Sequence, residues 1–153
     1  MFGLIPFVKA AGRGLGKLFG DDDAEEKLKK EVKSYDLETD GVNMSVDEDG
    51  VVTVKGEAAS QEMKEKIILS VGNIEGVSGV KDGLSTRTAG RASRFHTVER
   101  GDTLSAIAQT HYGKASLYPK IFDANRPMLK DPDEIYPGQV LRIPDLDGGT
   151  RSV

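Results

Sequence analysis

The segment TRTAGRAS, residues 86–93, most constrains how this chain can fold, because it divides the sequence into two small parts. It contains no large apolar residue and is rich in Ser, Thr, Gly and Arg, a composition typical of a linker. Before it lie a short segment, residues 1–20, and a domain of residues 21–85; after it lies a domain of residues 94–144. The remaining residues, 145–153, predict a disordered tail. Each domain must therefore build its own small hydrophobic core.

The composition excludes several classes of protein. The 153 residues include no Cys and no Trp, 6% are aromatic and 30% are charged, and the net charge is −4. Without Cys there are no disulfides, thiolate metal sites or cysteine nucleophiles, and the few aromatic residues fit small cores better than a large apolar pocket. The acidic residues concentrate in the middle domain, and a segment this acidic repels nucleic acid and attracts cations.

The N-terminal segment MFGLIPFVKAAGRGLGKLFG lacks the order of a secretory signal, in which positive charge precedes an unbroken apolar run. Lys9, Arg13 and Lys17 follow the apolar start and interrupt it, and no run reaches the roughly 18 apolar residues of a membrane span. We therefore expect a soluble, cytoplasmic protein. A helix lying on a membrane surface is an alternative, but Pro6 and several glycines weaken a continuous helix and favour docking of this segment onto its own protein.

The middle domain has the predicted order helix, strand, strand, helix, strand (αββαβ). Apolar residues recur at helical spacing in DDDAEEKLKKEVKSYDL, and they alternate with polar residues on both sides of Asp49–Gly50, which indicates a β-hairpin. The second helix is predicted in SQEMKEKIILSV, capped by Ser60 and ended by Gly72, and GVSGVKDGL supplies the third strand. This order and the hairpin VVTVKG resemble the BON domain, a small α/β module of bacterial envelope and stress proteins.

The C-terminal domain has the predicted order βααβ: a strand FHTV, a helix from Leu104, a second helix in SLYPKIFDAN and a strand QVLRIP. These elements, with the words HTVERGDTLSAIA, HYG and IYPGQVLRIP, resemble the LysM domain, although His96 stands where that family usually has Tyr. The fold implied is α/β (α+β), with two small domains. A BON domain followed by one LysM domain is similar to the cytoplasmic bacterial potassium-binding protein family, and this resemblance extends to Pro144.

The family resemblance implies K⁺ as the bound ligand and cofactor. K⁺ is large, weakly hydrated and singly charged, so it suits neutral backbone carbonyls better than a cluster of carboxylates. The last four carbonyls of a helix lack intrahelical partners and carry the negative end of the helix dipole. Glycines predict two such helix ends, one at residues 8–11 and one at residues 72–74. We expect the ion to be held by the backbone carbonyls of Val8, Ala11, Gly72 and Ile74. The alternative is that both are ordinary helix ends terminated by glycine.

An ion held by several segments would stabilise a compact form, because a ligand favours the state that binds it more tightly. The sequence thus predicts a monomeric K⁺ sensor or buffer that compacts on binding and reports to an unidentified protein partner. His96 and His111, the only histidines, lie in no recognisable metal-binding spacing, so we expect structural roles for them. No pattern of nucleophile and base is present, and we expect no enzyme.

The turn at residues 101–104 allows a different interpretation. In LysM domains generally, this turn and the loop after the second helix form a groove for N-acetylglucosamine chains. The resemblance therefore implies a peptidoglycan site at Gly101, Asp102, Thr103, Leu104 and Ile135. In the structural alternative, Gly101 permits a tight turn and Asp102 or Thr103 caps the helix. We favour the structural alternative, because a cytoplasmic protein meets no polymeric cell-wall glycan.

Overall fold

The computed structural model describes residues 3–8 and 24–146. The chain divides into two compact units between Gly90 and Arg91, which are described separately as unit 1 and unit 2. The predicted site residue Ala11 and most of the predicted tail lie outside the described residues. Both units combine helices and strands, so the predicted α+β class is confirmed.

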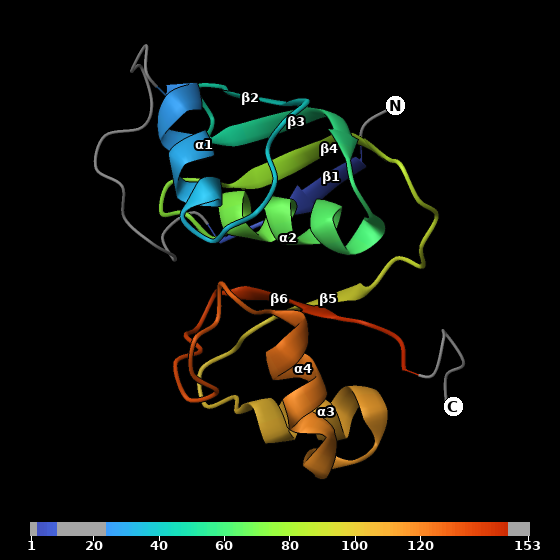
Figure 1. Cartoon of the computed structure of the whole chain (residues 1–153). Coiled ribbons are helices and arrows are strands. Elements are labelled where there is room, and N and C mark those ends of the chain that lie inside the picture. Colours follow the sequence, from blue (N-terminus) through green and yellow to red (C-terminus); the bar gives the residue numbers. More distant parts are fainter. Residues whose placement is uncertain (1–2, 9–23, 147–153) are drawn as a thin grey trace. The chain divides into compact units, whose positions relative to one another are not determined.

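Unit 1 is a four-stranded sheet with two helices packed on one face (Figure 1). Its strands lie in the order β1-β4-β3-β2. The β2–β3 pair is an antiparallel hairpin, β3 and β4 are parallel, and β1 is antiparallel to β4. Because parallel strands need a long crossover, helix α2 connects β3 to β4. The bounds of the elements are β1 Gly3–Pro6, α1 Ala24–Lys33, β2 Val42–Val46, β3 Val51–Ala58, α2 Gln61–Gly72 and β4 Gly79–Thr86.

The core of unit 1 follows directly from the period-two pattern of the strands. Val52 and Val54 of β3 are fully buried, and Val52 lies opposite Val80 of β4 on the face that the helices cover. From the helices, the buried apolar side chains are Ala24, Leu28 and Val32 of α1 and Ile67, Ile68, Leu69 and Val71 of α2. Ser60 caps α2 as predicted, since its hydroxyl accepts a hydrogen bond from the Met63 amide at 3.1 Å.

Strand β1 differs from the sequence-based expectation. The sequence predicted a segment docked onto the protein with a helix end at residues 8–11. Instead, residues 3–6 form a strand whose register runs from Gly3 opposite Asp82 to Pro6 opposite Gly79, and Val8 follows it outside any helix. The strand forms because β4 offers unpaired backbone groups at its free edge, a tertiary effect that local sequence does not contain. Pro6 is compatible with this position, since proline is tolerated in edge strands.

Unit 2 is a two-stranded antiparallel ribbon of β5 and β6 packed against the helices α3 and α4 (Figure 1). Its elements are β5 Arg94–Thr97, α3 Leu104–Tyr112, the 3-10 helix η1 Ala115–Leu117, α4 Tyr118–Ala124 and β6 Val140–Ile143. The predicted βααβ order is thus observed, with η1 as an addition before α4. The buried apolar residues of its core are Val98, Leu104, Ile107, Ala108, Ile121, Leu129, Leu141 and Ile143.

A buried amide joins the end of α4 to β6 in unit 2. Asn125, which is 2% exposed, donates from Nδ2 to the carbonyls of Ile121 at 2.8 Å and Arg142 at 3.0 Å. Its Oδ1 accepts from the Arg142 amide at 2.9 Å. The Arg142 guanidinium in turn donates to the Ala124 carbonyl at 2.9 Å. Polar groups of the helix end and the strand are therefore paired away from water, which stabilises their junction.

Candidate functional site

The first candidate site lies where the chain leaves β1 and meets the C-terminal end of α2. The Phe7 amide donates to the Ser78 carbonyl at 3.0 Å, continuing the contact between the N-terminal segment and the start of β4. The Phe7 ring lies directly on Gly72, because a Cβ atom added to that glycine would be 2.0 Å from the ring Cζ. Val8 follows Phe7 and is 42% exposed. Unit 1 thus anchors the residue before Val8 against the helix end that carries Gly72.

Helix α2 ends at Gly72, as predicted, but not through a left-handed glycine. Gly72 is the last helical residue and is not among the described glycines with positive φ. The C-cap is Asn73, with φ of −83°. A glycine is needed at position 72 because any side chain would overlap Phe7. Sequence reasoning missed this contact, since no local signal connects an aromatic residue near the start of the chain to a helix end far along it.

The backbone after α2 forms a tight turn that uses part of its hydrogen-bonding capacity. The Asn73 amide donates to the Leu69 carbonyl at 3.0 Å, and the Ile74 carbonyl accepts from the Val77 amide at 3.1 Å. The sequence analysis assumed that the Ile74 carbonyl accepts no hydrogen bond, and this assumption is wrong. A carbonyl oxygen nevertheless has a second lone pair that could bind an ion. Within the described ranges, no backbone amide outside the regular elements donates to the Gly72 carbonyl. These contacts of Val8, Gly72 and Ile74 do not test whether their carbonyls bind one ion, so the carbonyl site stays a prediction.

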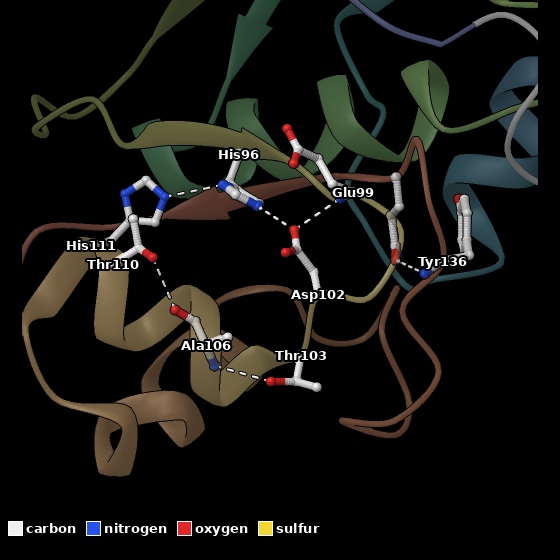
Figure 2. A network of polar contacts seen from close by, with 9 residues as sticks. His96, Glu99, Asp102, Thr103, Ala106, Thr110, His111 and Tyr136 are labelled. Atoms are coloured by element: carbon white, nitrogen blue, oxygen red, sulfur yellow. Dashed lines mark hydrogen bonds and ion pairs between the residues drawn. The ribbon is translucent and has the colours of Figure 1, made fainter.

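The second candidate site is the turn before α3, in unit 2. Thr103 is the N-cap of α3, and its hydroxyl accepts from the Ala106 amide at 3.1 Å (Figure 2). Asp102 does not cap the helix: its Oδ2 accepts from the Glu99 amide at 2.9 Å and faces His96 Nε2 at 3.0 Å. The Glu99 amide, and after it the hydrogen bond from His96, hold the pKa of the Asp102 carboxyl below its usual value. Gly101 has a φ of +91°, which explains a glycine there.

These contacts bear on the predicted glycan groove. The side chains of Asp102 and Thr103 already form hydrogen bonds within the domain, and Leu104 is 3% exposed, in the hydrophobic core. Ile135 is partly buried against the same core. The turn therefore forms the start of helix α3, which is what the structural alternative predicted. Glycan binding at these residues stays a prediction.

The Thr103 cap gives a direct test of that organisation. We expect Thr103→Ala to lower the free energy of unfolding by about 1 kcal/mol, because an amide at the start of α3 loses its partner. Urea denaturation followed by circular dichroism measures the change. Thr110→Ala on the same helix is the matched control, since that hydroxyl only donates to the Ala106 carbonyl within the helix, and we expect a change below about 0.5 kcal/mol. Equal effects of the two substitutions would show that Thr103 is not an important cap.

Two features are absent from residues 3–8 and 24–146. None of the helices in those ranges is both long and apolar enough to span a membrane. No three His, Cys, Asp or Glu side chains of those ranges gather in an arrangement suited to a metal ion.

Comparison with known proteins defines the class of this chain. Residues 20–88 match the BON domain family and residues 96–144 match the LysM domain family, so the chain is a two-domain BON–LysM protein. It is also 50% identical over 148 residues to potassium binding protein Kbp of Escherichia coli O6:H1, a match that covers 94% of this chain and 99% of that protein. The chain belongs to the family of potassium binding protein Kbp.

Other relatives share only a segment. An uncharacterized protein of Deinococcus radiodurans is 34% identical over 76 residues, which are 50% of this chain and 29% of the relative. An esterase of Mycobacterium tuberculosis is 54% identical over 48 residues, which are 31% of this chain and 10% of the esterase. Because so little of each relative is covered, these matches describe a shared segment and not the activity of the whole relative.

Proposed function

We propose that this chain binds K⁺ in the cytoplasm as an ion sensor or buffer and has no enzymatic activity. The observation that carries the proposal is the 50% identity, over nearly the full length of both chains, to a protein named for potassium binding. A match of this extent includes both domains and the segment before them. The relative that covers 94% of this chain is named for potassium binding and not for catalysis.

The carbonyls of Val8, Ala11, Gly72 and Ile74 are the proposed ligands. Pairing of β1 with β4 and the seating of Phe7 on Gly72 support the proposal, because they hold the backbone next to Val8 against the end of α2. The end of a helix presents carbonyl oxygens and the negative end of the helix dipole, which suits a monovalent cation. Neutral oxygens also match the weak hydration of K⁺ better than carboxylates do.

Binding through several segments has a conformational consequence. We propose that the bound protein is a monomer more compact than the ion-free one, because the ion favours the state in which its ligands converge. The segment 86–93 would act as the linker that permits the looser state, between a BON domain of residues 21–85 and a LysM domain of residues 94–144. An unidentified protein partner would respond to the change.

The proposal predicts a specific response to potassium. We expect a higher melting temperature in KCl than in NaCl at matched ionic strength, since only the native state binds the ion. At a K⁺ concentration of about 100 times Kd the stabilisation is about 2.7 kcal/mol, which corresponds to a rise of about 5–10 °C. Differential scanning calorimetry measures this rise, and small-angle scattering in the same buffers measures compaction. Equal melting temperatures in the two salts would contradict the proposal.

Amide NMR of the full chain distinguishes the proposed site from its alternatives. Titration with KCl, and separately with NaCl, should give K⁺-specific shifts at residues 8–13 and 72–76. Shifts confined to exposed carboxylates in both salts would indicate ionic screening instead. Retention on peptidoglycan that depends on Asp102 and Thr103 would favour the glycan-binding alternative, and liposome binding that depends on residues 1–20 would favour the membrane alternative.

A further inference from the structure

The two histidines of the chain, expected to have separate structural roles, face each other in unit 2. His96 lies on β5 and His111 lies in the last turn of α3, and His96 Nδ1 is 3.2 Å from His111 Nε2. The ring centroids are 5.2 Å apart and the ring planes are nearly perpendicular, at 88° (Figure 2). The His96 side chain is 21% exposed, so solvent reaches the pair. Folding of the turn between β5 and α3 therefore brings together two nitrogens that the sequence separates.

The neighbouring Asp102 determines which nitrogen of His96 carries the proton. Asp102 Oδ2 already accepts a hydrogen bond from the Glu99 amide, and a carboxylate only accepts hydrogen bonds. His96 Nε2, at 3.0 Å from Asp102 Oδ2, must then be the donor. In the neutral ring the remaining nitrogen, Nδ1, has its lone pair directed to the side of His111. With His96 neutral, His111 Nε2 is therefore the donor of the hydrogen bond between the two rings.

We propose that His96 Nδ1 and His111 Nε2 form a binding site for a divalent transition metal ion such as Zn²⁺ or Co²⁺. Two imidazole nitrogens bound to one tetrahedral zinc at 2.0–2.1 Å are about 3.3 Å apart, close to the 3.2 Å between these two atoms. In tetrahedral geometry each metal–nitrogen bond lies about 35° from the line joining the two nitrogens, so each ring must rotate to direct its lone pair at the ion. His111 shifts its proton from Nε2 to Nδ1, so the ion replaces the bridging hydrogen and no net proton is lost.

Asp102 acts on this site as a positioning residue. Metal-binding histidines usually donate their second N–H to a carboxylate, which fixes the ring and raises the basicity of the ligand nitrogen. His96 already has this arrangement before any metal binds, and Asp102 is itself held by the Glu99 amide at 2.9 Å. The orientation of one ligand is thus set in advance, which lowers the entropic cost of binding.

The predicted selectivity follows from the ligand type. Imidazole nitrogens suit zinc, cobalt, nickel and copper, whereas K⁺, Ca²⁺ and Mg²⁺ prefer oxygen. Because no third candidate side chain of the described ranges joins the pair, water or a ligand from another molecule completes the coordination. The site is independent of the proposed K⁺ site, which uses backbone oxygens of unit 1.

Titration of the full chain with CoCl₂ tests the proposal, because visible absorption reports the coordination of cobalt directly. We expect saturable binding at one equivalent, with absorption bands that MgCl₂ does not compete away and ZnCl₂ does. His96→Ala and His111→Ala should each weaken the apparent affinity at least tenfold, and Asp102→Asn should weaken it about 10-fold to 100-fold. Thr110→Ala, on the same helix as His111, is the control and should bind like the natural chain.

Imidazole ¹⁵N NMR of the unsubstituted chain keeps the test valid if a variant fails to fold. Addition of ZnCl₂ should shift His96 Nδ1 and His111 Nε2 most, and lowering the pH should reverse the shifts, because protons compete for the same nitrogens. Unshifted rings at saturating zinc would overturn the proposal. Unchanged cobalt affinity in a folded His111→Ala variant would also overturn it, because the metal would then lie elsewhere.

Discussion

Gly72→Ala is expected to destabilise unit 1 by about 3 kcal/mol, although alanine is normally the better helix former. The new Cβ would lie 2.0–2.3 Å from three ring atoms of Phe7, so the ring must leave its position. Phe7 is 8% exposed, and loss of a packed Phe side chain typically costs about 3–5 kcal/mol. The gain in helix propensity from Gly to Ala is only about 1 kcal/mol, so the steric effect dominates.

A double-mutant cycle separates this clash from other effects. In urea denaturation, Phe7→Ala alone should be destabilising, and adding Gly72→Ala to it should cost little more, because the overlapping ring is gone. Gly3→Ala in β1 is the matched control, since a Cβ there meets no atom within 4 Å, and it should leave stability nearly unchanged. If Phe7 positions Val8 for the ion, Gly72→Ala also abolishes the difference in melting temperature between KCl and NaCl. A stabilising Gly72→Ala would contradict the packing described.

Asn125→Leu is expected to destabilise unit 2 by at least about 3 kcal/mol. The substitution keeps the approximate volume but removes the partners of the Arg142 amide and carbonyl and one partner of the Ile121 carbonyl. Each buried backbone group left unpaired costs about 1–3 kcal/mol. Because Asn125 is 2% exposed, water cannot replace the lost bonds without opening the junction of α4 and β6.

The effect should be confined to one unit, which NMR of the full chain can resolve. In ¹H–¹⁵N spectra at moderate urea, we expect the amide signals of residues 94–144 to lose their native positions while those of unit 1 remain. Asn125→Asp should have a smaller effect, since its carboxylate still accepts from the Arg142 amide. Asn43→Ala, on the exposed side of β2, should leave the unfolding midpoint unchanged. An Asn125→Leu variant with the natural midpoint would show that the buried amide is not needed.

Local sequence signals predicted those parts of the fold that depend on neighbouring residues. The hairpin at Asp49–Gly50, the cap at Ser60 and the start of α3 at Leu104 all follow from turn residues and periodicity, and the structure has each of them. The choice between Asp102 and Thr103 as the cap was open because both side chains can accept from an amide. It is decided by His96, which engages Asp102 from β5.

Contacts between distant segments were not predictable in the same way. Strand β1 forms on the edge of β4, Gly72 accommodates Phe7, and His96 meets His111 only after the turn before α3 is folded. Each depends on tertiary structure and leaves no periodic pattern in the sequence. For the proposed K⁺ site, the glycines in the sequence indicated two candidate regions, residues 8–11 and 72–74. The spacing of the glycines does not say which carbonyls of these regions converge.

The pairing of β1 with β4 also sets an order of events on the ribosome. The ribosome makes Gly3–Pro6 before α1 and α2, yet the residues that pair with this strand, Gly79–Asp82, emerge only after those two helices have been made. Closing such a long loop is entropically costly, so we expect β1 to dock last in folding and detach first in unfolding. The backbone beside Val8 would then be the part of unit 1 that can dock when an ion binds and detach when the ion leaves, while the rest of unit 1 stays folded.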